Sequence, residues 1–243
     1  MKKLVRYFVH LAYDGTRYHG WQIQPNGISV EGEIERCLST LLRQPIDIMG
    51  AGRTDAGVHA RHMVAHFDYD SSVDNLVYRL NRILPPDITV YKIEPVSPDM
   101  HARFSATSRT YHYYIHTQKS PFSRNYSWYC HYHLDFPLMN EAASLLLKYS
   151  DFASFCKSHT DVKTTLCKVT EAKFYENEDS YYFRITANRF LRNMVRAIVG
   201  TLVDVGRHRI SLEEFQHIIE QGKRTNAGES MPAHALFLEK IEY

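Results

Sequence analysis

A glycine-rich run contains the residues best suited to chemistry. It reads, in order of its notable residues, Gly50, Gly52, Arg53, Thr54, Asp55 and Gly57. Glycine lets a backbone adopt unusual dihedral angles and lets a ligand approach closely, and short loops at strand ends often carry reacting groups. Asp55 could serve as a nucleophile, a general base or a metal ligand, and Arg53 could bind a phosphate. The same residues also allow a plain turn in which Asp55 accepts a hydrogen bond from a nearby backbone N–H.

Two stretches of the chain carry several basic residues and no acid. Residues 100–134 include Arg103 and Arg109, and residues 180–203 include four arginines. Clustered positive charge of this kind indicates a face that attracts a polyanion such as RNA. The alternative is ordinary solvated surface, and the formal net charge of +2 does not decide between them.

Elements that could position these residues follow from hydrophobic periodicity and from turn residues. In the first half we expect strands over 4–12, 46–49, 63–67 and 88–96, with helices over 29–42 and 73–84. In the second half we expect strands over 109–117, 165–175, 181–187 and 236–243, with helices over 139–149, 190–205 and 211–221. Each half then has the order β-α-β-β-α-β, with one extra helix in the second.

This order predicts an α+β protein made of two ferredoxin-like halves. We expect antiparallel sheets side by side, helices on one face and a catalytic cleft between the halves. The N-terminal half, residues 1–100, would carry the Asp55 loop, and the C-terminal half would be residues 101–243.

The remaining bulk features are those of an ordinary intracellular protein. The basic N-terminus is not followed by an apolar stretch typical of a secretory signal, and no run is long enough to span a membrane. Four scattered cysteines, without a C-x-x-C pair, favour free thiols. We expect a cytoplasmic protein without a membrane anchor.

Several segments together resemble one family. The run Ala51-Gly-Arg-Thr-Asp55-Ala-Gly-Val-His59 resembles the signature of bacterial-type tRNA pseudouridine synthases that act on the anticodon stem-loop. Further segments match in the expected order at residues 13–22, 101–113, 151–155 and 188–200. The resemblance therefore covers nearly the whole chain.

The resemblance implies an isomerase that converts uridine to pseudouridine at positions 38, 39 and 40 of the anticodon arm. Such an enzyme cleaves the N-glycosidic bond, rotates the uracil and rejoins it through carbon. The resemblance further implies tRNA as substrate, a homodimer, and no cofactor or metal.

The resemblance also assigns roles to individual residues. Asp55 matches the catalytic aspartate; whether it attacks C1′, attacks the base or removes the 2′ proton stays open. Tyr111 matches the tyrosine that stacks on the target base and serves as a general base. Arg196 matches the basic partner of the aspartate, Arg53 matches the arginine proposed to extrude the nucleotide, and Leu236 matches an apolar residue packing against the active site.

Other residues extend or depart from this pattern. The candidates for phosphate contacts are Arg109, Arg184, Arg189 and Arg192. Ala235 and Phe237 stand where the family usually has Gly and Tyr, so the approach of the backbone to the ribose is open. Glu31 stands where the family often has Gln, and its effect is open as well.

Two alternatives remain at this stage. His59, His62 and His66 could hold zinc together with a carboxylate. A non-catalytic or degenerate RNA-binding protein of the same fold could use the aromatic-rich residues 111–132 for stacking. The Gly-Arg-Thr-Asp run argues against a simple binder, which has no use for it.

Overall fold

The computed structural model describes residues 4–157, 162–177 and 180–243. The described chain is an α+β protein with five α-helices and nine strands in a mixed sheet. The expectation of antiparallel sheets side by side is therefore corrected to one continuous sheet, which is mixed because β6 pairs in parallel with β5. The chain divides into two compact units: the described residues up to Thr107 with Leu238–Tyr243, and Ser108–Phe237.

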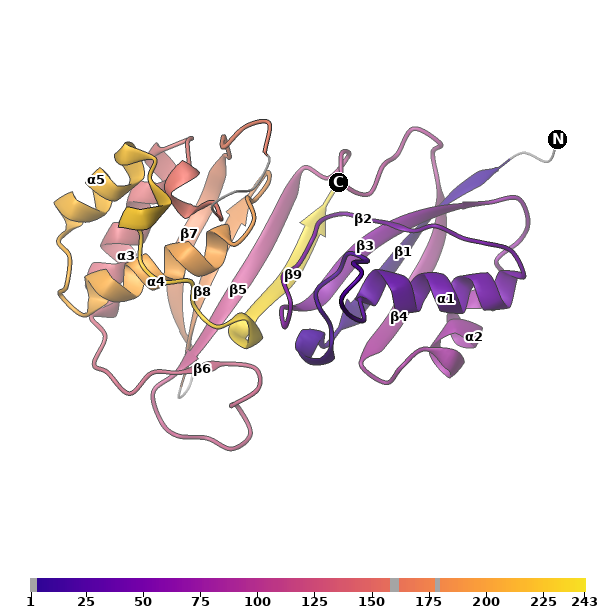
Figure 1. The fold of residues 1–243 in the computed structure, drawn as a ribbon, viewed down its shortest axis with the longest axis horizontal. Coiled ribbons are helices and arrows are strands. Elements are labelled where there is room, and N and C mark those ends of the chain that lie inside the picture. The colour runs from indigo at the N-terminus through magenta and orange to yellow at the C-terminus, as the bar shows by residue number, and fades with distance from the viewer. Residues whose placement is uncertain (1–3, 158–161, 178–179) are drawn as a thin grey trace. The chain divides into compact units, whose positions relative to one another are not determined.

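The first unit has a β-α-β-β-α-β order followed by the end of the last strand. Its strands and helices are β1 (Val5–Tyr13), α1 (Val30–Leu42), β2 (Met49–Gly50), β3 (His59–Tyr69), α2 (Leu76–Ile83), β4 (Ile88–Val96) and most of β9 (Leu236–Glu242). The strand order is β4-β1-β3-β9, with β2 beside β3. Strand β1 is antiparallel to both β3 and β4, and β2 is antiparallel to β3. Helices α1 and α2 pack against each other (Figure 1).

Apolar residues at the period of each element build the core of this unit. On β1, Val9, Leu11 and Tyr13 are buried at every second position, as alternation in a strand requires, and Phe8 is buried on the other face. On α1, the buried residues Val30, Ile34 and Leu38 recur at helical spacing. The helix and the sheet therefore bury their apolar faces against each other.

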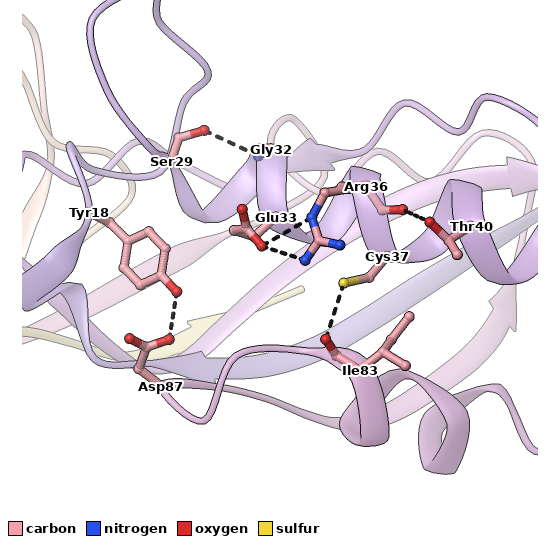
Figure 2. Close-up of polar contacts among 9 residues, drawn as sticks. All are labelled: Tyr18, Ser29, Gly32, Glu33, Arg36, Cys37, Thr40, Ile83 and Asp87. Atoms are coloured by element: carbon pink, nitrogen blue, oxygen red, sulfur yellow. Dashed lines mark hydrogen bonds and ion pairs between the residues drawn. The ribbon is translucent and has the colours of Figure 1, made fainter.

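Polar contacts cap the start of α1 and join α1 to α2 (Figure 2). The side chain of Ser29 accepts a hydrogen bond from the N–H of Gly32 at 3.1 Å and caps the start of α1. The Cys37 thiol donates to the carbonyl of Ile83 at 3.8 Å and links α1 to the end of α2. Helices α1 and α2 of this unit are therefore joined by a side-chain contact as well as by packing.

The second unit carries the remaining strands and helices. They are β5 (Ser108–His116), β6 (Trp128–Tyr129), α3 (Phe136–Leu145), β7 (Val169–Asn177), β8 (Ser180–Ala187), α4 (Met194–Gly206) and α5 (Leu212–Gln221). The antiparallel strands follow the order β5-β8-β7, and α3, α4 and α5 pack against one another (Figure 1). Eleven of the thirteen residues of α4 are buried, so α4 is the central helix of this unit.

Several expected boundaries are corrected by backbone conformation. Helix α4 begins at Met194 rather than at residue 190, because Asn193 adopts a left-handed conformation with φ 67°. Helix α2 likewise begins after Asn75, whose φ is 56°. Strand β2 has two residues instead of four, and β6 was not expected. The connection between the strands expected over 165–175 and 181–187 includes residues outside the described part.

Two expectations on bulk features can be compared directly with the structure. All four cysteines are free and buried, which confirms the expected thiols. Within the described residues, no helix combines the length and apolar character needed to cross a membrane.

Candidate active site

The Asp55 loop joins β2 to β3 in the first unit. Asp55 is half-buried, Thr54 is buried and Arg53 is exposed. The loop closes with a turn in which the N–H of Val58 donates to the carbonyl of Asp55 at 3.1 Å. Gly57 has φ 78° within this turn, a conformation that glycine adopts without strain.

The loop backbone is held by the segment that follows β1. The N–H of Trp21 donates to the carbonyl of Thr54 at 3.3 Å, and the N–H of Gly57 donates to the carbonyl of Tyr18 at 3.3 Å. The hydroxyls of Tyr13 and Thr54 are hydrogen-bonded at 2.8 Å in a buried position. Buried bonds of this kind fix a loop because breaking one leaves an unsatisfied polar group.

Glycines allow this segment to approach the loop closely. A Cβ at Gly15 would lie 2.0 Å from the carbonyl oxygen of Val58, and a Cβ at Gly20 would lie 2.3 Å from that of Thr54. Both distances are shorter than any real Cβ contact. Residues 13–22 therefore form the platform of the Asp55 loop; we name this segment the loop platform.

Side chains in turn fix the loop platform. The Tyr18 hydroxyl donates to Asp87 at 2.5 Å (Figure 2), and burial together with this bond raises the pKa of Tyr18 above its usual range. Glu31 accepts hydrogen bonds from the indole N–H of Trp21 at 3.1 Å and from the N–H of Ile23 at 2.9 Å. The residue whose effect the sequence left open thus ties α1 to the platform.

The supporting residues Tyr13, Tyr18 and Trp21 are not among those predicted from the sequence. The glycine and aromatic residues at 13–22 are visible in the sequence, and this segment resembles the family. The resemblance assigns no role to them. In the structure, this segment forms hydrogen bonds with the Asp55 loop.

The three histidines of the zinc alternative have separate partners. His59 Nδ1 lies 3.0 Å from the N–H of Gly15, and His62 Nε2 lies 3.2 Å from a nitrogen of His10. His66 Nδ1 accepts from the N–H of Ala102 at 3.2 Å. Within the described residues, no group of three or more His, Cys, Asp or Glu side chains could hold a metal ion.

His66 makes the stability of the first unit depend on pH. Burial, followed by the nearby charge of Arg6, lowers the pKa of His66 to about 4. An unfolded histidine titrates near pH 6.5. Between about pH 4 and pH 6.5, the unfolded chain therefore binds a proton at this residue more readily than the folded chain does. The free energy of unfolding should therefore fall by roughly 3 kcal/mol as pH drops from about 6.5 to about 4.

Urea unfolding at pH 7 and at pH 4.5 measures this loss, and a comparison of variants isolates it. The free energy of unfolding of His66→Gln should fall less between the two pH values than that of wild type, because the titrating group is gone. His217→Gln removes an exposed histidine on α5. Its free energy of unfolding should fall by as much as that of wild type. Equal falls for wild type and His66→Gln would refute the assignment.

The second unit holds Tyr111, Arg196 and Leu236. Tyr111 lies on β5 and is buried, with its ring packed edge-on against Phe190 at 5.1 Å between centroids. The Arg196 side chain, on α4, donates to the carbonyl of Met231 at 2.6 Å. Leu236 is buried at the start of β9.

The four candidates for phosphate contacts also lie in this unit. Arg109 donates to the carbonyl of Asn188 at 2.7 Å, and Arg189 donates to carbonyls of residues 164 and 166. Arg184 lies 3.1 Å from a carboxylate oxygen of Glu171. Arg192 is exposed. A guanidinium has five N–H donors, so one bond to the protein leaves donors for a phosphate.

The departures at residues 235 and 237 are accommodated locally. Ala235 is fully buried and is not one of the described non-glycine residues with positive φ, so glycine is not required there. The Phe237 ring packs at 90° against Tyr114, with centroids 5.2 Å apart. Both side chains are therefore part of the apolar interior of the protein.

Comparisons with known proteins identify the class of enzyme to which the chain is similar. A family model described as tRNA pseudouridine synthase matches residues 142–243. The tRNA pseudouridine synthase A of Bacteroides fragilis is 58% identical over 98% of this chain and 96% of the relative. The enzymes of the same name from Porphyromonas gingivalis and Chlorobaculum tepidum are 53% and 41% identical, over 99% and 97% of this chain and 98% and 96% of the relatives.

These identities over nearly the full length settle the family. The chain belongs to the tRNA pseudouridine synthase A family, and it is an isomerase. Among solved structures, an unknown protein from Galdieria sulphuraria aligns over 85% of this chain and 94% of its own at 11% identity, with a TM-score of 0.27. A likeness that low carries no argument about the fold.

Proposed function

We propose that this enzyme isomerises uridine at positions 38, 39 and 40 of the tRNA anticodon arm, in the cytoplasm. The observation that carries the proposal is the 58% identity to a tRNA pseudouridine synthase A along almost the whole chain. The signature run lies within that match, and the loop platform holds it by buried hydrogen bonds. A carboxylate in a fixed loop suits chemistry that needs its oxygens aligned with the reacting atoms.

Asp55 is the catalytic carboxylate in this proposal. Attack on C1′, attack on the base and removal of the 2′ proton each require an ionised carboxylate close to the ribose. Each also requires that water be kept away from the reactive intermediate. The half-buried position of Asp55 supports this role because it shields the carboxylate partly from bulk water.

Tyr111 and Arg196 complete the proposed chemistry from the second unit. Tyr111 stacks on the target uracil and serves as general base, since stacking holds a detached ring without fixing its rotation. Arg196 acts as the counter-charge of Asp55, because a nearby cation keeps a partly buried carboxylate ionised. Arg53 grips the backbone while the nucleotide is extruded, a step that costs a few kcal/mol. Leu236 packs against the site.

We also propose that each half is a ferredoxin-like domain, with the Asp55 loop in the first. The order of elements in the first unit supports this, as do the neighbouring strands β4, β1 and β3 and the pairing of β2 with β3. In the second unit, we propose that phosphate contacts are made by Arg109, Arg184, Arg189 and Arg192. By resemblance to the family, we also propose that the enzyme is a homodimer.

Release of tritium from tRNA carrying 5-tritiated uridine tests the function. Wild type should release tritium from a tRNA with uridine in the anticodon arm and not from one with cytidine at those positions. Tyr111→Phe should bind this tRNA as wild type does and release tritium more slowly. Binding without release by wild type would favour the degenerate RNA-binding alternative, and full turnover by Tyr111→Phe would contradict the role of its hydroxyl.

A further inference from the structure

A tight turn at residues 101–105 of the first unit presents an aromatic ring to solvent. Phe104 is 76% exposed, more than any other described large hydrophobic side chain in this unit. The Arg103 guanidinium lies over the Phe104 ring, 5.6 Å from its centroid. An exposed ring backed by a cation suits stacking on a flat partner with negative charge nearby.

The turn is held by its own polar groups. His101 Nδ1 accepts from the N–H groups of Arg103 and Phe104 at 3.1 and 3.3 Å. The N–H of His101 donates to the Ser105 hydroxyl at 2.9 Å, and the N–H of Ser105 donates to the carbonyl of His101 at 2.9 Å. Phe104 is therefore presented by a stiff backbone, which lowers the entropy lost when a ligand stacks on it.

Neighbouring side chains fix the turn to the sheet. The N–H of Ala102 donates to His66 on β3, and the carbonyl of Ala102 accepts from the Tyr243 hydroxyl at 2.8 Å. The rings of His66 and His101 lie 4.6 Å apart, and those of His101 and Phe104 lie 4.4 Å apart. A continuous series of rings thus supports the exposed Phe104.

A pocket of about 260 Å³ connects this turn with the Asp55 loop. Its lining includes both Arg103 and Arg53, and Arg53 lies two residues before Asp55. The lining also includes Glu31, Glu35 and Asp47, which would repel a phosphate placed inside the pocket. The arginines are exposed and can meet a backbone that passes outside it.

We propose that Phe104 stacks on an unpaired base of the substrate RNA next to the target uridine, with Arg103 and Arg53 contacting the adjacent phosphates. This inference rests on the proposed function, because it places the stacked base beside the nucleotide that Asp55 acts on. An RNA strand fits better than an apolar protein surface, because two guanidinium groups accompany the ring. Residues 100–134 also carry no acid.

Titration of wild type and variants with fluorescent tRNA tests the inference. Phe104→Ala should weaken binding between about 5-fold and about 150-fold, the range for loss of one stacked base. Phe104→Tyr should restore it, because a ring remains. Tyr78→Ala is the matched control, since Tyr78 on α2 is 70% exposed; it should bind as wild type does.

Salt dependence separates stacking from charge. Arg103→Gln should reduce the slope of log affinity against log salt by about 0.7 to 0.9, as for one lost phosphate contact, and Phe104→Ala should leave that slope unchanged. The tritium assay should give a raised KM for Phe104→Ala with kcat unchanged. Because affinity is read without turnover, failure of the catalytic proposal leaves this test intact.

Three outcomes overturn the inference. They are wild-type affinity in Phe104→Ala, an equal loss in Tyr78→Ala, and a change of oligomeric state in Phe104→Ala by sedimentation. The last would assign the ring to a contact between two copies of the chain.

Discussion

Asp55→Asn is expected to lower tritium release from tRNA by at least about 1000-fold, within the range for loss of an acid–base group. Asparagine has the shape of aspartate but cannot act as an anionic nucleophile or base. The turn at Asp55 uses its backbone carbonyl, and the loop platform binds Thr54 and Gly57. The variant should therefore fold and bind tRNA as wild type does.

A second carboxylate in the same unit provides the control. Asp74 is exposed in the turn before α2, and Asp74→Asn makes the same chemical change away from the loop. Its tritium release should equal that of wild type. Substantial release by Asp55→Asn, measured with tRNA in saturating amount, would exclude Asp55 as the catalytic carboxylate.

Gly20→Ala is expected to lower kcat/KM by about 100-fold or more, because a displacement of about 1 Å at a catalytic group can cost that much. Gly20 has φ 90°, and a Cβ there would lie 2.3 Å from the carbonyl oxygen of Thr54 and 3.1 Å from the carbonyl carbon of Asp55. The loop must move for the methyl group to fit. Steady-state kinetics, together with the melting temperature, measures the effect.

Gly222→Ala separates backbone strain from displacement of the loop. Gly222 also has positive φ, 65°, but a Cβ there meets only the Cβ of Ala153 at an ordinary 3.7 Å. This variant should lose about 1 kcal/mol of stability or somewhat more and keep its kcat/KM. Similar kinetics for the two alanine variants would mean that the platform does not set the position of Asp55.

Much of the fold could be predicted, because most elements have strong periodicity and clear end signals. The strand at 88–96 has the predicted bounds, and helix α5 begins after the Ser211 cap. The helix starts are predicted wrongly where a single non-glycine residue adopts a left-handed backbone conformation, which its residue type does not require. Asn75 and Asn193 take positive φ and delay the starts of α2 and α4.

Strand β6 shows a different limit. It has two residues, Trp128 and Tyr129, and pairs in parallel with the end of β5. So short a strand has no periodicity of its own. Its existence depends on a partner strand, which the local sequence does not specify.

For the candidate site, a carboxylate suited to chemistry stands out in the sequence, whereas the contacts that hold its loop do not. Asp55 stands in a recognisable run, whereas the partners of that run come from residues 13–22, and Glu31 in turn binds Trp21 of that segment. Contacts between segments so far apart in sequence leave no periodic signal. The glycines at 15 and 20 were visible, but the carbonyl groups they approach emerge only from the folded backbone.

The central claim is that the carboxylate of Asp55 forms pseudouridine in the anticodon arm. Mass spectrometric mapping of pseudouridine in unmodified tRNA, after a single turnover with excess enzyme, tests it most directly. Wild type should place pseudouridine at positions 38, 39 and 40 where uridine is present, and Asp55→Asn should leave those uridines unchanged. Pseudouridine formed at these positions by Asp55→Asn at the wild-type rate would contradict the claim.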